Sequence, residues 1–393
     1  MNWLSSLNQK QTSGYSKGGY DRILLAATLL LCLLGVVMIY SASTSLSDRF
    51  YGSSLIFLRN HLLNLLVGLA AMYLAMRVPY SVWKSWVPVF LVFCLALLIL
   101  VVIPGIGHQV GGARRWLRLG SFSLQPTELL KLAMIFNVAY FLDRKGDLVH
   151  EFRRGLVPNI VVMGVFLSLV MLQPDFGTSV LIALTVTLMI FVGGAKPGHI
   201  LFGLAGFGMI GALLIVSQSY RMKRMLAFLD PWQDRLDTGF QIIQSYLAFG
   251  SGGWFGVGLG DSRQKMFFLP EAHTDFVVSI LGEELGVMGV VFLVGLLAVF
   301  LWRGFAICLQ SADDFGRYLA FGITASLGLQ MVLNLAVVMG MMPTKGLPLP
   351  FISYGGSALL VSLTMTGILL SVGRYQSPQT PSGISTRMEA RSV

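Results

Sequence analysis

Apolar residues gather in long stretches along most of the chain, each bounded by a few polar or charged positions. A helix needs about 20 such residues to cross the hydrocarbon of a bilayer. Some stretches are shorter, so we expect those helices to extend into flanking polar residues. Open strand edges in lipid leave backbone groups unpaired, which favours helices throughout. The pattern predicts transmembrane helices near residues 23–40, 62–76, 86–102, 129–141, 156–171, 179–192, 200–216, 277–302, 318–340 and 359–372.

Composition supports an all-α polytopic membrane protein of about ten transmembrane helices. Of 393 residues, 55% are hydrophobic and 12% are charged, whereas soluble domains have roughly 25% charged residues. The net charge of +10 lies mostly in short segments between apolar stretches, which favours anionic lipid headgroups over nucleic acid as its partner. Cys32, Cys94 and Cys308 show neither metal-ligand spacing nor a disulfide framework, so we interpret them as small side chains that face lipid or other helices.

Loop charges predict the topology. An even number of spans places both termini on one side, and that side carries about twice as many lysines and arginines as the other side's short loops. The termini are therefore expected to be cytoplasmic. The predicted organisation is a cytoplasmic tail (1–21), a ten-helix membrane domain (22–372) with one long extracytoplasmic loop (217–276), and a disordered cytoplasmic tail (373–393).

A first charged cluster lies before and within the fourth span. It combines Arg114 and Arg115 with Glu128 and Lys131, which are three residues apart and so share one face of a helix. Ionisable residues at membrane depth are costly and usually functional. The cluster is either a site for a phosphate-bearing lipid, since arginine binds phosphate bidentately, or an internal ion pair with arginines that snorkel to the surface.

A second cluster precedes the eighth span. Asp275 is the last charged residue before a long apolar stretch, whose environment would raise its pKa towards that of a general base, although it could also serve as a helix cap. His273 is interpreted first as a loop hydrogen-bonding residue. Glu283 lies on the same helix face as Asp275, whereas Glu284 faces the opposite way.

A third segment, 343–357, is rich in proline and glycine and contains Lys345 and Ser353. Such composition before a span predicts a re-entrant segment that lines a cavity. Residues 173–178 form another tight turn, in which Asp175 is interpreted as the cap of the next helix.

These motifs resemble those of the SEDS family (shape, elongation, division and sporulation), which includes the division protein FtsW and the rod-shape protein RodA. The resemblance covers nearly all of residues 22–372. Two further motifs, Thr344-Lys345-Gly346-Leu347 and Gly282-Glu283-Glu284-Leu285-Gly286, resemble the division branch. Thr127 stands where serine is common in the family. The matching motifs occur in the family's order: Gly112-Ala113-Arg114-Arg115-Trp116, Gln125-Pro126-Thr127-Glu128-Leu129-Leu130-Lys131, Gln173-Pro174-Asp175-Phe176-Gly177, Leu269-Pro270-Glu271-Ala272-His273-Thr274-Asp275-Phe276 and Ile352-Ser353-Tyr354-Gly355-Gly356-Ser357.

The resemblance implies a peptidoglycan glycosyltransferase that polymerises lipid II into β-1,4 glycan strands at the division septum, on the outer face of the bacterial cytoplasmic (inner) membrane. It implies that lipid II, the nascent glycan strand, a class B penicillin-binding protein transpeptidase, other division proteins and membrane lipids are partners, and that nucleic acid is not. A divalent cation, Mg²⁺ or Mn²⁺, is also implied, although the sequence shows no metal site.

By resemblance, Asp275 is the catalytic carboxylate, and Glu128 and Lys131 line the same cavity. A single base suffices for inversion from an α-linked donor, because a pyrophosphate leaving group needs no general acid. We expect Lys131 to lie within a few ångströms of Asp275, since each charge is costly alone near lipid. The predicted substrate-binding residues are Arg114, Arg115, Glu128, Lys131, His273, Glu283, Lys345 and Ser353.

Two other functions are compatible with ten helices: a flippase that moves lipid II across the bilayer, and a non-catalytic scaffold of the division machinery. A flippase needs charges that can be reached from both faces. The candidate charges all fall on the extracytoplasmic side, which favours the polymerase.

Overall fold

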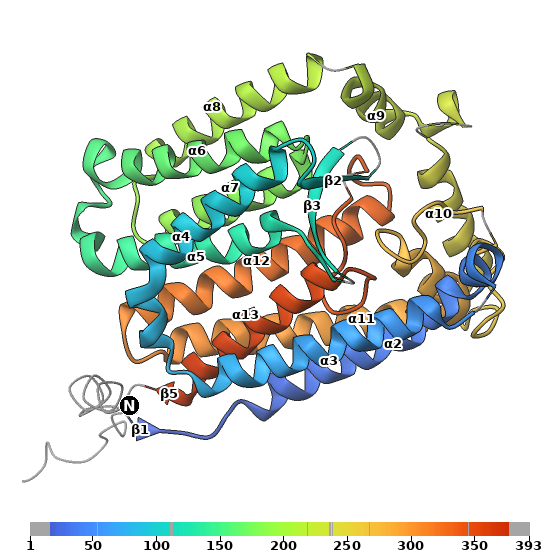
Figure 1. The fold of residues 1–393 in the computed structure, drawn as a ribbon, viewed down its shortest axis with the longest axis horizontal. Coiled ribbons are helices and arrows are strands. Elements are labelled where there is room, and N and C mark those ends of the chain that lie inside the picture. The colour runs from blue at the N-terminus through green and yellow to red at the C-terminus, as the bar shows by residue number, and fades with distance from the viewer. Residues whose placement is uncertain are drawn as a thin grey trace, which may run out of the picture.

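The computed structural model describes residues 16–376, apart from 53, 111–112, 121, 218, 236, 238, 267 and 345. It is a bundle of long helices (Figure 1), and each predicted apolar stretch lies within one of them or extends past its end by at most two residues, which confirms the all-α polytopic fold. These helices are α2 (Arg22–Tyr51), α3 (Ile56–Arg77), α4 (Tyr80–Val102), α5 (Pro126–Lys145), α6 (Val157–Leu172), α7 (Phe176–Val192), α8 (Pro197–Val216), α11 (Val277–Gln310), α12 (Asp314–Val338) and α13 (Gly356–Arg374).

Length and hydropathy do not mark all ten helices equally. Among the described residues, seven helical segments are long and apolar enough to cross a membrane: α2, α3, α4, Phe152–Leu172, α11, α12 and α13. Helix α7 and the Pro197–Leu213 part of α8 are apolar but shorter. Helix α5 carries charged residues near both ends, including Glu128 and Lys131, and the bundle buries that pair.

The centre of the bundle is formed by α5, α12 and α13. Most residues of α12 and α13 are buried. Helix α13 packs along α3, α11 packs along α2 and α12, and α5 lies against α4, α7 and α12. Helix α8 lies at the edge of the bundle (Figure 1) and exposes large apolar side chains such as Leu201, Phe202 and Leu213. The polar candidates Glu128 and Lys131 on α5 are therefore enclosed by protein.

One end of the bundle, which we call the loop end, carries most of the remaining secondary structure (Figure 1). An antiparallel sheet there joins β2 (Gly107–Val110), β3 (Ala113–Leu119) and β4 (Phe122–Leu124). The long segment 217–276 is also partly helical and contains α9 (Ser219–Leu229), the 3₁₀ turn η3 (Pro231–Asp234) and α10 (Phe240–Gly252).

The opposite end, the terminal end, brings the two ends of the described chain together. There β1 (Ser16–Lys17) pairs antiparallel with β5 (Tyr375–Gln376). Two short helical turns, η1 (Gly146–Leu148) and η2 (Phe152–Leu156), connect α5 to α6.

The proline- and glycine-rich segment before α13 contacts α2 closely. A Cβ atom at Gly35 would lie 2.6 Å from the Phe351 carbonyl oxygen, so only glycine permits this approach. The backbone turns at Phe351, where φ is 70°, and the Ser353 amide donates to the Leu349 carbonyl (3.1 Å). This turn fixes the segment, part of which lines the cavity described next.

Candidate active site

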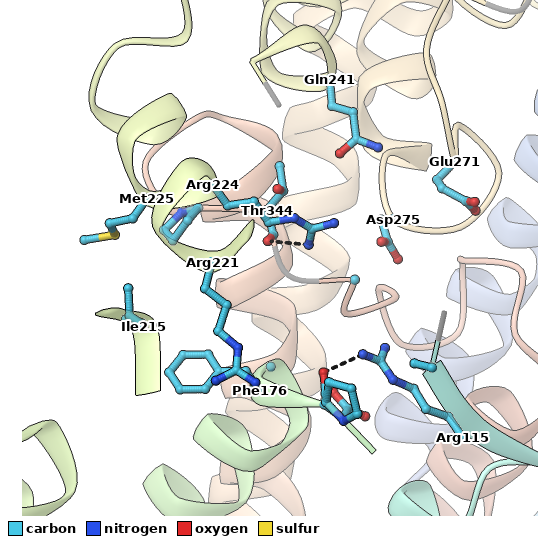
Figure 2. Close-up of a pocket in the computed structure, with 16 residues that line it drawn as sticks. Arg115, Phe176, Ile215, Arg221, Arg224, Met225, Gln241, Glu271, Asp275 and Thr344 are labelled. Carbon is cyan, nitrogen blue, oxygen red and sulfur yellow. Dashed lines mark hydrogen bonds between the residues drawn. The ribbon is translucent and has the colours of Figure 1, made fainter. Parts of the chain in front are cut away.

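A cavity of about 560 Å³ lies at the loop end and is lined by both carboxylates and arginines (Figure 2). Its wall is assembled from β3, the turn before α7, α9, α10, the residues before α11 and part of the segment before α13. The segment before α13 thus lines a cavity, as its composition predicted. The charged lining residues are Arg115, Asp175, Arg221, Arg224, Glu271 and Asp275.

Asp275 is held in this cavity through its backbone. The Asn334 side chain on α12 donates from Nδ2 to the Asp275 carbonyl (2.9 Å) and to the Leu347 carbonyl (2.8 Å). One amide therefore joins three parts of the chain. Gly346 has a φ of 66°, and a Cβ atom there would lie 3.4 Å from Asp275 Oδ2. The carboxylate itself has neither a hydrogen-bond nor an ion-pair partner among the described residues, so it is available to a ligand.

The electrostatics of the cavity bring Asp275 into the range of a general base. Burial raises the pKa of its carboxyl group to about 7, and the nearby charge of Glu271 adds to the rise, while Arg224 and Arg115 oppose it. An ordinary aspartate has a pKa of about 3.9. A base whose pKa lies near the working pH is present in its ionised form and still accepts a proton well.

Arg115 reaches the cavity from β3. Its Nε donates to the Gln173 carbonyl (2.9 Å) and its Nη2 to the Pro174 carbonyl (2.6 Å), which joins the sheet to the turn before α7. Successive side chains of a strand point to opposite faces. Ala113 and Arg115 both line the cavity, whereas Arg114 lies on the other face of β3 and is not part of its lining. The structure thus separates the two arginines that the sequence grouped together.

Two further arginines, Arg221 and Arg224, line the cavity from α9. They are three residues apart, so they share one face of this helix. The Arg221 guanidinium lies 5.9 Å from the centre of the Phe176 ring, and Arg224 Nη1 donates to the Thr344 carbonyl (3.4 Å). Neither was named from the sequence as a site residue. The signal was present, because residues 220–229 form a basic amphipathic segment.

Glu128 and Lys131 form the predicted pair on α5, but away from the cavity lining. Lys131 Nζ lies 2.7 Å from Glu128 Oε2 and donates to Gln330 Oε1 on α12 (2.7 Å), with all three residues buried. The prediction that Lys131 contacts Asp275 directly is therefore wrong. Helix packing gives Lys131 a nearer carboxylate on its own helix and an amide across the α5–α12 interface, which together satisfy its charge.

Comparisons with known proteins cover nearly all of the chain. A profile of the FtsW/RodA/SpoVE family, described as cell cycle proteins, matches residues 21–378. The chain belongs to this family. It is 45% identical over 359 residues to a Geobacter metallireducens protein named "Probable peptidoglycan glycosyltransferase FtsW", covering 90% of this chain and 94% of the relative.

Other relatives extend this comparison across the family's branches. The stage V sporulation protein E of Bacillus subtilis is 46% identical, with 90% of this chain and 97% of that protein aligned. A solved chain from a peptidoglycan synthase complex, described as coordinating polymerization and crosslinking, has a TM-score of 0.75 and 31% identity over 90% of this chain and 98% of its own. The rod shape determining protein RodA of Thermus thermophilus has a TM-score of 0.67 and 29% identity, covering 90% and 97%.

Asp175, from another of the family's motifs, does two things at once. It caps α7, as the sequence predicted, by accepting from the Thr178 amide (3.2 Å) and hydroxyl (2.9 Å). It also lines the cavity. The Gln125 side chain donates to its carboxylate (3.3 Å) and so links this turn to the start of α5.

His273 and Ser353, two other predicted substrate-binding residues, have structural partners. The His273 carbonyl accepts from the Tyr354 amide (2.9 Å), and its ring contacts those of Phe57 and Tyr354. Burial lowers the pKa of His273, against the opposing effect of Glu271, so a neutral imidazole is expected at pH 7. The buried Ser353 hydroxyl accepts from the Leu349 amide (2.8 Å).

Glu283 and Lys345 complete the predicted set. Glu283 is buried and accepts from the backbone amides of Arg263 (3.0 Å) and Gln264 (3.3 Å), so it supports the loop before Asp275 instead of lining the cavity. Lys345 lies outside the described residues. Whether any of these residues binds substrate stays a prediction.

A dedicated metal centre does not fit the described side chains. Among them, no three His, Cys, Asp or Glu residues gather closely enough to hold a metal ion. Three carboxylates do line the cavity, but Arg115 and Arg224 lie close enough to Asp275 to act on its charge. The chemistry proposed below therefore uses the protein's own side chains.

Proposed function

We propose that this protein is a peptidoglycan glycosyltransferase that polymerises lipid II into β-1,4-linked glycan strands during septal cell-wall synthesis in bacterial division. The observation that carries the proposal is the Asp275 carboxylate, which has a pKa near 7 and shares a cavity with three arginines. The names of the relatives agree with this activity.

In the proposed reaction, Asp275 is the general base. Its carboxylate takes the proton from a sugar hydroxyl of the acceptor, and that oxygen forms the new bond to the anomeric carbon of the donor. The bond between this carbon and the pyrophosphate oxygen breaks, and the pyrophosphate leaves with the electron pair. Attack from the face opposite the leaving group converts an α-linked donor into a β-linked product.

Arg115, Arg221 and Arg224 would neutralise the charge that develops on the departing pyrophosphate. Guanidinium groups bind phosphate oxygens in pairs, and donors fixed in a cavity need little rearrangement during the reaction. The arginines reach the cavity from two separate elements, β3 and α9. A pyrophosphate between them would contact cations on both sides.

The substrate's polyprenyl chain requires an apolar path, and a second cavity offers one. This cavity of about 590 Å³ lies between α6, α7 and α8 and is lined almost wholly by apolar side chains. Phe176 lines both this cavity and the polar one. A lipid whose pyrophosphate lies at the arginines could therefore place its chain beside α8.

A flippase is the second candidate, because buried charges such as Glu128 and Lys131 would suit a transport path. In the structure, however, Lys131 of this pair also donates to Gln330, and all three side chains are buried in protein. The loops and short elements that line much of the charged cavity gather at one end of the bundle (Figure 1), as polymerisation on one face of the membrane requires.

The loop-charge bias supports a cytoplasmic location for both termini, which would place the loop end and Asp275 outside the cytoplasmic membrane. A class B penicillin-binding protein is the proposed partner, because the solved synthase complex is described as coordinating polymerization with crosslinking. Its transpeptidase would act on the strands made at the loop end. Location at the septum, with other division proteins, follows from the resemblance to the division branch.

Polymerisation of purified lipid II by the purified protein tests the proposal, with and without the transpeptidase partner. We expect glycan strands from the wild type and none from Asp275→Asn, an uncharged variant of nearly the same shape. Lys223→Gln, which removes an exposed charge of α9 outside the cavity lining, is the matched control and should keep its activity. Strand synthesis by Asp275→Asn would reject the assignment, and lipid II translocation without polymerisation would favour the flippase.

A further inference from the structure

Asp275 lies two residues before α11, and a break separates the first turns of this helix from the rest. At Gly286, φ is 66° and ψ is −163°, a conformation that is not helical and is accessible mainly to glycine. The orientation of residues 277–285 is therefore not fixed by the rest of α11. Contacts with other parts of the chain must set the direction from which Asp275 enters the cavity.

Part of this orientation comes from the backbone of the loop after α10. The Val257 amide donates to the Glu283 carbonyl (3.0 Å) and the Gly258 amide to the Glu284 carbonyl (3.1 Å), just before the break. The carbonyls of Gly253 and Trp254 accept from the first two amides after it (2.9 and 3.2 Å). The loop thus satisfies the groups that the break exposes, but it does not join this part of α11 to α2.

Glu284 supplies the connection to α2, in addition to the hydrogen bonds that join Ser279 to Ser245 of α10 (2.8 Å) and the Asp275 backbone to Asn334 of α12. It is completely buried, and the Ser41 hydroxyl on α2 lies 2.5 and 2.7 Å from its two carboxylate oxygens. Lys265 Nζ lies 3.1 Å from Glu284 Oε1 and also donates to Ser41 (3.1 Å) and to the Gly260 carbonyl (2.5 Å). We call Ser41, Lys265 and Glu284 the α2 latch.

Helix α2 is a suitable reference for both parts of α11. Beyond the break, Arg303 of α11 pairs with Asp21 at the start of α2 (2.5 Å). Before the break, Glu284 contacts Ser41 of the same helix. Helix α2 therefore contacts α11 on each side of the break. Glu284 and Arg303 are 19 residues apart, and their partners Ser41 and Asp21 are 20 residues apart.

We propose that Glu284 is a positioning residue: through the α2 latch, it fixes the first turns of α11 and so places the Asp275 carboxylate for proton transfer. This inference rests on the proposed role of Asp275 as the base. Glu284 does not line the cavity and has no contact with the site of reaction. Its effect should appear in the chemical step and leave substrate binding nearly unchanged.

Steady-state polymerisation by Glu284→Gln tests this. A displacement of about 1 Å at a reacting group can cost roughly 10²-fold in rate. We expect kcat per folded protein to fall at least about tenfold, KM for lipid II to stay within about twofold, and the acidic midpoint of the kcat profile to move as Asp275 shifts relative to its charged neighbours. If Glu284 had a structural role only, the variant would contain less folded protein. The folded fraction would keep the wild-type KM, kcat and acidic midpoint of the kcat profile.

Two companion variants make the test decisive. Ser41→Ala cuts the link to α2 while the Lys265–Glu284 ion pair remains, so it should lower kcat in the same direction, and it decides the question if Glu284→Gln does not fold. Asp21→Asn breaks the other contact between α2 and α11 and should leave kcat unchanged. Wild-type kcat and midpoint in folded Ser41→Ala and Glu284→Gln would overturn the proposal, as would an equal loss of kcat in Asp21→Asn. Activity in Asp275→Asn would instead contradict the proposed function.

Discussion

Lys131 Nζ lies 2.7 Å from Glu128 Oε2, one turn earlier on α5, and both side chains are almost completely buried. Gln330 accepts from the same ammonium and donates to the Pro348 carbonyl (2.7 Å). This network joins α5, α12 and the segment before α13. None of the three residues lines the charged cavity, so the network holds together helices and a segment that surround it.

Loss of one charge from this pair should destabilise the protein strongly. We expect Lys131→Met to lower the free energy of unfolding by about 3–5 kcal/mol, because it leaves the Glu128 carboxylate buried without a partner. Thermal unfolding in detergent, followed by circular dichroism, measures the change. The double variant Glu128→Gln/Lys131→Met removes both charges and should recover part of the loss; a double variant less stable than Lys131→Met would contradict this account.

Activity and stability should respond to pH in opposite directions through Asp275. Its ionised form is the proposed base, so kcat/KM should fall about tenfold per pH unit below a midpoint near 7 and level off above it. Its folded-state pKa is raised above the unfolded value, so its contribution to stability is full below about pH 4 and is lost as pH rises through 7. Asp275→Asn should remove both effects. A wild-type profile with no titration between pH 6 and 8 would contradict this prediction.

The arginines of α9 should act on substrate binding. We expect Arg221→Gln or Arg224→Gln to raise KM for lipid II at least about tenfold, which corresponds to about 1.4 kcal/mol and is within the range of one charged phosphate contact. Lys223→Gln on the same helix should change KM less than twofold. Inhibition by inorganic pyrophosphate gives an independent readout, since it should weaken in the two arginine variants and persist in the lysine variant.

The apolar pattern was sufficient to predict the bundle. Each stretch of apolar residues became a helix because lipid leaves few other ways to pair the backbone. Even α5, the least apolar of the ten, was located through the Pro126 start and the apolar residues after Lys131. The break at Gly286 could not be predicted, because its hydrogen-bond partners at 253–258 lie far away in sequence.

The candidate site was predictable only in part. Asp275 stands out because it is the last charge before a long apolar helix, and its raised pKa follows from that position. Arg114 and Arg115 look equivalent in the sequence, yet strand alternation places only Arg115 in the cavity. The partner of Lys131 depended on how α5 packs against α12, which local spacing does not reveal.

The glycine beside the catalytic candidate offers a test of the cavity's geometry. Gly346 has a φ of 66°, and a Cβ atom there would lie 3.4 Å from Asp275 Oδ2. Gly346→Ala would combine backbone strain with a new van der Waals contact between the methyl group and the carboxylate. Gly120 has a similar φ of 63°, and nothing lies within 4 Å of a Cβ atom built there. The left-handed conformation costs about 1–2 kcal/mol for a residue with a side chain, so both alanine variants should lose similar stability.

Only Gly346→Ala should also lose activity. Relief of the backbone strain would shift the 346–347 backbone next to the carboxylate, and Asn334, which contacts both Asp275 and Leu347, would transmit the shift. We expect kcat per folded protein to fall at least about tenfold in Gly346→Ala and to stay near the wild-type value in Gly120→Ala. Equal kcat in the two variants would mean that the backbone position at Gly346, beside the carboxylate, has no role in catalysis.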